Sequence, residues 1–168
     1  MSLSSTFKND ARIVRFCAAE HDALVSKLSE VMDPSLFSSI IVVQPLPVYF
    51  GELGQAAGGN VLGLEDTVRE NALILAGGLG IDPRASDASV QVATAALKSM
   101  SERIDRFVAE VNGEIAFRYM NYATEDQDPL GSYGEANVRF MKDVAARYDP
   151  NGVFQTRLPG GFKLSEAA

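Results

Sequence analysis

The sequence predicts an α+β fold, with a small and mostly antiparallel sheet flanked by helices. Two long stretches carry hydrophobic residues at helical spacing, apolar and β-branched runs lie between them, and strands and helices do not alternate regularly. Such an order favours an antiparallel sheet with helices packed on it over a parallel βαβ fold. The chain has 168 residues, with no repeat and no linker, so we expect a single domain over residues 1–168.

The first predicted element is an amphipathic helix over residues 10–32. Its apolar positions, among them Val14, Leu24 and Leu28, recur at steps of three, four or seven along the full set. The helix should end before Pro34, because a residue that precedes proline disfavours the α region.

A β-branched run over residues 38–44 predicts a buried strand. Pro45 and Pro47 follow, and each lacks the N–H group that a sheet ladder needs. The chain should therefore leave the sheet centre there or run along a sheet edge.

The next part of the chain is rich in glycine. We expect a glycine-rich turn leading into a strand at residues 58–64, and a further strand over residues 71–76 that ends in the glycines of residues 77–80. These two segments complete the central part of the predicted sheet.

The second long helix is predicted to begin at Asp82, which suits an N-cap, with Pro83 at the first helical position. It should run to about Val111. Asn112 and Gly113 then form the left-handed C-terminal cap that ends many helices.

The last third of the chain predicts a strand at residues 115–122 and a helix that ends near Tyr148. Ser132 and Glu135 have the spacing of a capping box, so Ser132 is the expected N-cap of that helix. Residues 153–164 are predicted to be irregular, with one short strand.

Composition excludes several classes of function. The formal net charge of −7 disfavours nucleic-acid binding, because an acidic protein repels the phosphate backbone. The apolar run of residues 40–43 is far too short to span a membrane, and the N-terminus lacks the apolar core of a signal peptide, so we expect a cytoplasmic protein. One cysteine and one histidine cannot form an internal disulfide or a zinc site, and no metal is expected.

Common catalytic motifs are also missing from the sequence. The glycines match no nucleotide-binding spacing, and no Gly-x-Ser-x-Gly elbow of a serine hydrolase occurs. The carboxylates of Glu125, Asp126 and Asp128 are expected to form a solvated loop rather than an acid–base pair.

His21 and Cys17 lie on the apolar side of the first predicted helix. His21 has two interpretations: a general acid or base tuned by a partly apolar pocket, or a core histidine that bonds one carbonyl. Cys17 has no neighbouring cation to lower its pKa, so we interpret it as a packed structural thiol.

The run Tyr119-Met120-Asn121-Tyr122 offers polar groups for a substrate. In a strand, Tyr119 and Asn121 would share one face, where a phenol beside an amide can clamp a substrate or relay a proton. Two tyrosines in a strand can equally serve packing alone.

Six segments resemble one known family. They are YMNYA at residues 119–123, QDPLGSYG at 127–134, YDPNGVFQ at 148–155, PGGFKL at 159–164, QPLP at 44–47 and GGNVLGL at 58–64. Together they resemble the C-terminal, substrate-domain portion of fungal berberine bridge enzyme-like oxidoreductases, which are FAD-linked flavoproteins of the vanillyl-alcohol oxidase superfamily. The resemblance covers the chain from about Thr6.

The resemblance implies a set of site residues. In the family, the segment matching Tyr119, Asn121 and Tyr122 lies near the flavin ring and the substrate. We therefore expect Tyr119 and Tyr122 as catalytic residues, and we add His21 to them as the candidate general acid or base described above. Asn121, Gln44 and Asn60 are the expected substrate-binding residues.

The same resemblance implies FAD, but the family binds FAD through an N-terminal domain to which nothing in these 168 residues corresponds. The expectation is therefore that this chain binds no cofactor. A domain that normally packs against another would expose apolar surface, so we also expect a homodimer in which a second copy replaces the other half.

Three functions remain open at this point. The first is a flavin-independent cyclase, pericyclase or isomerase that holds a hydrophobic, polyketide-like metabolite of fungal secondary metabolism in a reactive conformation. The second is the substrate domain of an FAD-dependent oxidoreductase whose flavin domain is separate. The third is a non-catalytic binding or scaffold module.

Overall fold

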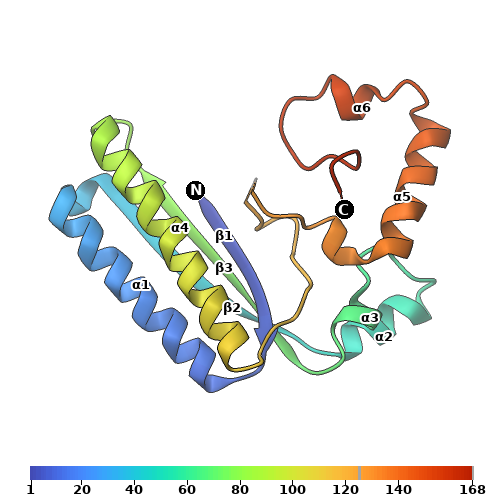
Figure 1. The fold of residues 1–168 in the computed structure, drawn as a ribbon, viewed down its shortest axis with the longest axis horizontal. Coiled ribbons are helices and arrows are strands. Elements are labelled where there is room, and N and C mark those ends of the chain that lie inside the picture. Colours follow the sequence, from blue (N-terminus) through green and yellow to red (C-terminus); the bar gives the residue numbers. More distant parts are fainter. Residues whose placement is uncertain (125, 168) are drawn as a thin grey trace.

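The computed structural model describes residues 1–124 and 126–167, and it has the predicted α+β fold (Figure 1). Its strands are β1 (Ser2–Lys8), β2 (Phe37–Leu46) and β3 (Ala72–Ile81), which form one antiparallel sheet in the order β1-β3-β2. Its helices are α1 (Ala11–Val31), α2 (Tyr49–Ala56), α3 (Leu64–Thr67), α4 (Asp87–Glu110), α5 (Glu135–Tyr148) and α6 (Val153–Thr156). Short 3₁₀ turns lie at Pro34–Leu36 and Gly131–Tyr133.

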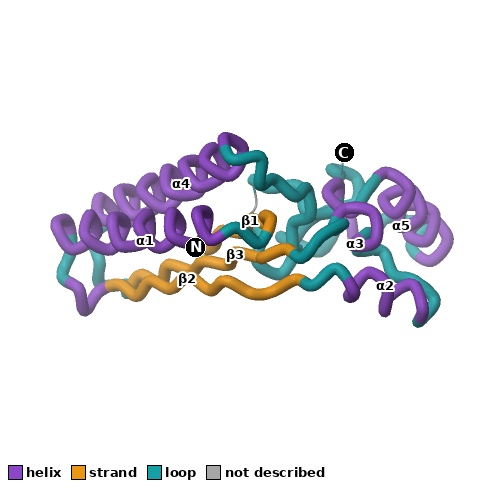
Figure 2. Tube along the Cα trace, turned by 90° about the horizontal axis from the view of Figure 1, so that it is seen from below, coloured by secondary structure: helices purple, strands orange, loops and turns teal. Residues whose placement is uncertain are grey.

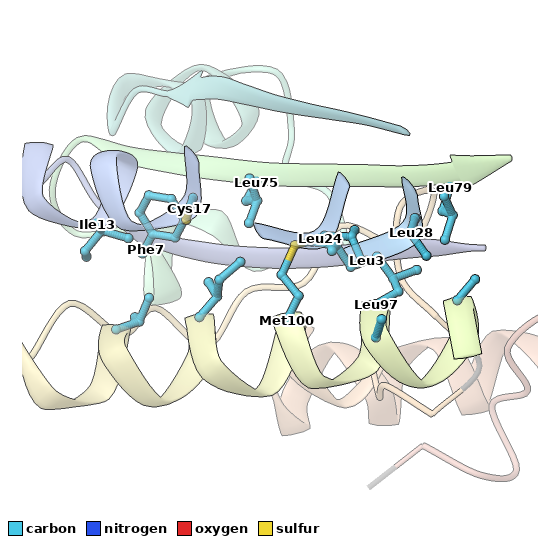
Figure 3. Packing of buried hydrophobic residues seen from close by; sticks show 14 of the residues in the cluster. Leu3, Phe7, Ile13, Cys17, Leu24, Leu28, Leu75, Leu79, Leu97 and Met100 are labelled. Atoms are coloured by element: carbon cyan, nitrogen blue, oxygen red, sulfur yellow. The ribbon is translucent and has the colours of Figure 1, made fainter. Parts of the chain in front are cut away.

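Helices α1 and α4 lie side by side on one face of the sheet (Figure 2). The larger hydrophobic core fills the space between these two helices and the sheet (Figure 3). Alternate side chains of the strands point into it, so that Leu75 and Leu79 of β3 face the helices together with Leu3 and Phe7 of β1. We call this side of the sheet the helix face.

The opposite face of the sheet is covered only in part. Leu46, Ala72 and Ile74 lie at one end of it and pack in a second core with residues from α3, α5 and the segment after α4. Further along β2, Ile40 and Val42 are 60% and 41% exposed. We call this side of the sheet the open face.

Several predicted boundaries are confirmed. Asp10 caps α1 by accepting a hydrogen bond from the backbone N–H of Arg12. At the end of α4, Asn112 has a φ of 54°, and the N–H of Gly113 donates to the carbonyl of Val108. This is the left-handed cap expected for that helix.

The strand predicted over residues 38–44 is β2, and it continues through Pro45 because it is an edge strand. The hydrogen bond from the Asp82 N–H to the Leu36 carbonyl fixes which residues of β2 face β3. Since bonded positions alternate along an antiparallel pair, the nitrogen of Pro45 faces outward, where no ladder bond is lost.

Two predicted strands are wrong. Residues 58–64 form a turn between α2 and α3, with φ near 100° at Gly58. Residues 115–122 form no strand in the described structure, and the only bridge beside them joins Phe7 to Glu114. Side chains hold this segment instead, because Ser132 Oγ accepts from the Arg118 N–H.

Both predicted N-caps are also wrong. Asp82 accepts from the N–H of Arg84 in a turn before α4, and Ser86 caps that helix. Helix α5 ends at Tyr148 as predicted, but it begins after Gly134, because Ser132 is already bonded to other groups.

Three further differences concern strand content. β3 does not stop before its glycines but continues to Ile81, and β1, at the other sheet edge, was not predicted at all. The tail forms the short helix α6 where a strand was expected, because both oxygens of Asp149 accept N–H groups at the start of that helix. Glu125 of the predicted acidic loop lies outside the described residues.

Candidate functional site

The structure brings together the three residues of the predicted Tyr-x-Asn-Tyr site, although they lie in a turn rather than a strand. Asn121 Nδ2 donates a 3.0 Å hydrogen bond to the hydroxyl of Tyr119. The rings of Tyr119 and Tyr122 meet edge to face, with their centroids 5.1 Å apart. The turn is closed by a bond from the N–H of Tyr122 to the carbonyl of Tyr119. We call Tyr119, Asn121 and Tyr122 the tyrosine cluster.

Phe117 and Tyr133 support the tyrosine cluster from the second core. The ring of Phe117 stacks on those of Tyr119 and Tyr133, and the Tyr133 hydroxyl accepts a 3.3 Å hydrogen bond from the N–H of Met120. Burial raises the pKa of Tyr133, so this phenol stays protonated at neutral pH. Tyr133 was not singled out from the sequence, because its role depends on a contact 13 residues away.

Gln44 lies on the open face, paired across the ladder with Ile74, which packs in the second core beside the tyrosine cluster. Asn60 is exposed in the turn between α2 and α3, where its side-chain oxygen accepts from the N–H of Leu62. The structure thus assigns Asn60 a turn-forming contact and places Gln44 on the open face.

His21 lies on the other side of the sheet. Its Nε2 is 2.9 Å from Ser39 Oγ, and both residues belong to the helix face. Cys17 is fully buried in the helix-face core, and this burial raises its pKa to about 12. The structure does not bring His21 to the tyrosine cluster, and it supports the interpretation of Cys17 as a packed thiol.

A groove of about 690 Å³ runs between β1, α4 and the four residues Ala123, Thr124, Asp126 and Gln127. Leu3 and Leu97 form its apolar wall, and Lys98 and Glu102 of α4 supply charge at its rim. The sequence could not reveal this groove, because β1 carries mostly serine and threonine and lacks the apolar alternation that signals a strand.

Two hydroxyl groups of β1, on the side of the strand opposite to Leu3, lack hydrogen-bond partners. Ser4 Oγ and Thr6 Oγ1 belong to residues no more than 1% exposed, and neither has a hydrogen-bond partner. Gln127 Nε2 donates to the carbonyl of Ser4 and so fastens the end of the tyrosine-cluster segment to β1.

The described residues do not fit the pyrophosphate of FAD. Such a group binds free N–H groups at a helix N-terminus, with cations nearby. The N-termini of α1, α4 and α6 are occupied by Asp10, Ser86 and Asp149, and α5 carries the carboxylate of Glu135 in its first turn. Near the helix N-termini, the arginine side chains of Arg12, Arg84 and Arg139 are paired with acidic residues, for example Arg12 with Asp10.

Within the described ranges, no group of three or more His, Cys, Asp or Glu side chains is arranged to hold a metal ion. None of the helices in this part of the chain combines the length and apolar character needed to cross a lipid bilayer.

Comparison with known proteins shows which proteins this chain is related to, which its geometry alone does not reveal. No protein-family model matches the chain, and no solved structure matches it. The chain is 32% identical over 160 residues to the FAD-dependent monooxygenase drtC of Aspergillus calidoustus and 33% identical over 167 residues to the FAD-dependent monooxygenase sdcF of Emericella nidulans. It is also 28% identical over 126 residues to the bifunctional solanapyrone synthase of Alternaria solani.

These alignments cover 95%, 98% and 74% of this chain but only 30%, 33% and 23% of the respective relatives. The chain therefore spans about a third of the length of the two monooxygenases. Over nearly its whole length, it is homologous to one portion of fungal FAD-dependent monooxygenases.

Proposed function

We propose that this chain is the substrate-binding portion of an FAD-linked monooxygenase of the berberine bridge enzyme-like type, acting on a hydrophobic, polyketide-like metabolite. The observation that carries the proposal is the open face of the sheet, which exposes Ile40 and Val42 and whose covered end packs in the second core together with the tyrosine cluster. The similarity to proteins named FAD-dependent monooxygenase supports it.

The open face has the properties of a wall for a flat apolar molecule. Ile40 and Val42 offer exposed aliphatic side chains. Gly78, which pairs with Ile40 across the ladder, has no side chain, so the sheet surface is flat at that point. Binding sites for small molecules combine such apolar walls with a few placed polar groups.

The tyrosine cluster supplies those polar groups. Because the Asn121 amide already donates to the Tyr119 hydroxyl, the hydroxyl proton is free to be donated outward, and the amide oxygen of Asn121 can accept. The edge-to-face contact with Tyr122 holds the phenol ring in place. A substrate carbonyl or hydroxyl would thus be oriented by groups that are already fixed, which lowers the entropic cost of binding.

In this proposal the flavin supplies the redox chemistry and is held by another polypeptide segment, since the described residues offer no cradle for its pyrophosphate. The contribution of this chain is to bind the substrate, orient it and exclude water from one side of it.

Binding of 2-naphthol, a simple hydrophobic phenol, tests the open face. We expect Val42→Glu to weaken binding of 2-naphthol at least tenfold in isothermal titration, because it places a charge on the apolar wall. Val31→Glu is the matched control: Val31 is 40% exposed against 41% for Val42, but it lies at the end of α1. Equal effects of the two variants, or no measurable binding to the unmodified chain, would overturn the proposal.

A flavin-independent cyclase or isomerase is a second candidate. Two observations favour it: the absence of a pyrophosphate cradle among the described residues, and the similarity to a protein named bifunctional solanapyrone synthase. In that case the chain alone converts its substrate while remaining colourless, and Tyr119→Phe abolishes the conversion, whereas His21→Ala, on the other side of the sheet, leaves it in place. Substrate conversion that requires bound flavin, seen as a yellow sample, excludes this candidate.

A further inference from the structure

Strand β1 lies at one edge of the sheet, and its backbone groups face two ways. At its start, the N–H of Met1 donates to the carbonyl of Leu79 and the N–H of Leu79 donates to the carbonyl of Met1. Because bonded positions alternate along an antiparallel pair, the N–H and C=O groups of Ser2, Ser4 and Thr6 point away from β3. We call this row of backbone groups the outer edge of β1.

Two contacts occupy part of the outer edge of β1. The N–H of Lys8 donates to the carbonyl of Gly113, and Gln127 Nε2 donates to the carbonyl of Ser4 at 2.8 Å. Within the described residues, the N–H groups of Ser4 and Thr6 donate to no acceptor. Both residues are no more than 1% exposed, and buried backbone groups almost always have a partner. The Gln127 amide thus takes a place that the N–H of a neighbouring strand would occupy.

The side chains of the same two residues also lack partners. Ser4 Oγ and Thr6 Oγ1 are buried and form no hydrogen bond with the part of the chain that the structure describes. Residues directly opposite each other on neighbouring strands bring their Cβ atoms to within about 5.5 Å, where hydroxyl and amide side chains bond one another. One additional strand beside β1 would therefore satisfy both the backbone and the side chains of Ser4 and Thr6.

The groove of about 690 Å³ lies along the outer edge of β1, between this strand and α4. Leu3 and Leu97 give it an apolar wall. Its described charged residues are Lys98, Glu102, Asp105 and Asp126, so that carboxylates outnumber cations. The groove thus suits an extended segment that turns apolar and basic side chains toward α4.

From these observations we infer that the groove is a docking slot for one β-strand, which pairs with the outer edge of β1 and extends the sheet to four strands. The strand has alternating character. Its hydroxyl or amide side chains lie opposite Ser4 and Thr6, and its apolar and basic side chains lie beneath α4. Addition of a strand to a free sheet edge is a common way to bind an extended segment, since the backbone supplies the affinity and alternate side chains supply the specificity.

The β1 strand of a second copy does not fit this slot in the antiparallel manner of the rest of the sheet. Helix α4 packs on β1 and also lines the groove beyond it. Pairing two β1 strands would place two α4 helices over strands that are only about 4.8 Å apart. Packed helices need about 8–10 Å between their axes. The strand that enters the slot must therefore come without a helix on this face.

The occupant is a strand from the portion of the monooxygenase that this chain does not match. The chain spans only 30% and 33% of the length of drtC and sdcF, so most of such an enzyme consists of other segments. The choice of this partner rests on the proposed function. It does not depend on substrate binding at the open face, because the outer edge of β1 takes no part in that binding.

Hydrogen exchange tests the slot, in this chain alone and in a chimera that carries it in place of the matching third of drtC of Aspergillus calidoustus. In the chimera we expect two more protected amides in the peptides that cover β1, those of Ser4 and Thr6. Residues 39–43 of β2, at the other sheet edge, are the control and should exchange equally in both proteins. No added protection in β1, or added protection in β2 instead, would overturn the inference.

Two neighbouring serines give a matched test of the hydroxyl groups. Ser5 Oγ donates to Asp105 at 2.8 Å, so Ser5→Ala should lower the melting temperature of both proteins. Ser4 Oγ has no such partner, so Ser4→Ala should lower the melting temperature of the chimera by about 2–4 °C but not that of the chain alone. Equal effects of Ser4→Ala on the two proteins would overturn the inference.

These measurements separate the slot from the proposed function. Exchange and melting are recorded without substrate, so protected β1 amides in a chimera that consumes no oxygen would support the slot and count against the proposed function. An active chimera whose β1 amides exchange as fast as in the chain alone would overturn the slot and leave the proposed function in place.

Discussion

Cys17 shows how burial decides the chemistry of a single residue. The thiol lies in the helix-face core, fully buried, and this burial raises its pKa from an ordinary value of 9.0 to about 12. The sequence predicted the inert thiol correctly, because helical spacing placed it on the apolar side of α1. It could not decide the role of His21, since the partner of that residue, Ser39, lies 18 residues away on a strand.

We expect Cys17 to react with a thiol reagent only after unfolding. The folded state keeps the neutral thiol, whereas the unfolded chain ionises it above about pH 9, so the unfolded state binds fewer protons between pH 9 and 12. The stabilisation from this group is therefore complete below pH 9 and is lost as the pH rises toward 12. Reaction with Ellman's reagent at pH 8, with and without urea, checks the prediction; rapid reaction of the folded protein would contradict it.

At the scale of elements, the sequence predicted α1, β2, most of α4 and the end of α5, because hydrophobic periodicity and the residues that end a helix are local signals. It failed where distant contacts decide. Residues 115–122 look like a strand, yet β1 pairs with this part of the chain only at the Phe7–Glu114 bridge. The strand β1 could not be predicted, because its serines and threonine do not form an alternating apolar pattern. Tertiary packing buries these polar residues, and the sequence does not show that packing.

Two adjacent glycines of β3 provide a matched test of the sheet faces. A Cβ atom on Gly77 would lie 2.8 Å from Leu3 Cγ in the core, whereas one on Gly78 would lie 3.7 Å from Ile40 Cγ2 on the open face. Gly77→Ala should therefore lower the free energy of unfolding by about 1–3 kcal/mol. Gly78→Ala should change it by less than about 1 kcal/mol. Urea denaturation measures both, and equal losses would contradict the assignment of faces.

The start of α4 gives a second test at this scale. Ser86→Ala removes the observed cap and should cost about 1 kcal/mol of stability. Asp82→Ala removes an exposed turn contact with Arg84 and should cost about half as much or less. Urea denaturation measures the free energy of unfolding of both variants. A larger loss of stability for Asp82→Ala than for Ser86→Ala would support Asp82 as the helix cap and contradict the observed cap.

At the scale of the whole molecule, the chain uses only one face of its sheet for its main core. The other face remains open at Ile40 and Val42, and α5 exposes Phe140, Val144 and Tyr148. The family resemblance identified Tyr119, Asn121 and Tyr122 as a group, and the structure brings them into contact. The open face could not be predicted from the sequence, because its exposure depends on which other elements of the chain cover the sheet.

The central claim is that this chain forms the substrate wall of a flavin-dependent monooxygenase. The most direct measurement replaces the matching third of drtC of Aspergillus calidoustus with this chain and records the visible spectrum and substrate-dependent oxygen uptake of the purified chimera. Tyr49→Ala is the control for Tyr119→Ala, because Tyr49 is an exposed tyrosine on α2. Thermal denaturation verifies that each protein is folded.

The account predicts a yellow, folded chimera that consumes oxygen with its substrate. Tyr119→Ala should lower that rate at least tenfold and Tyr49→Ala should leave it unchanged, while both variants keep their flavin. A folded, yellow chimera whose oxygen uptake is equally insensitive to both substitutions would contradict the claim, as would substrate conversion by this chain alone in the absence of any flavin.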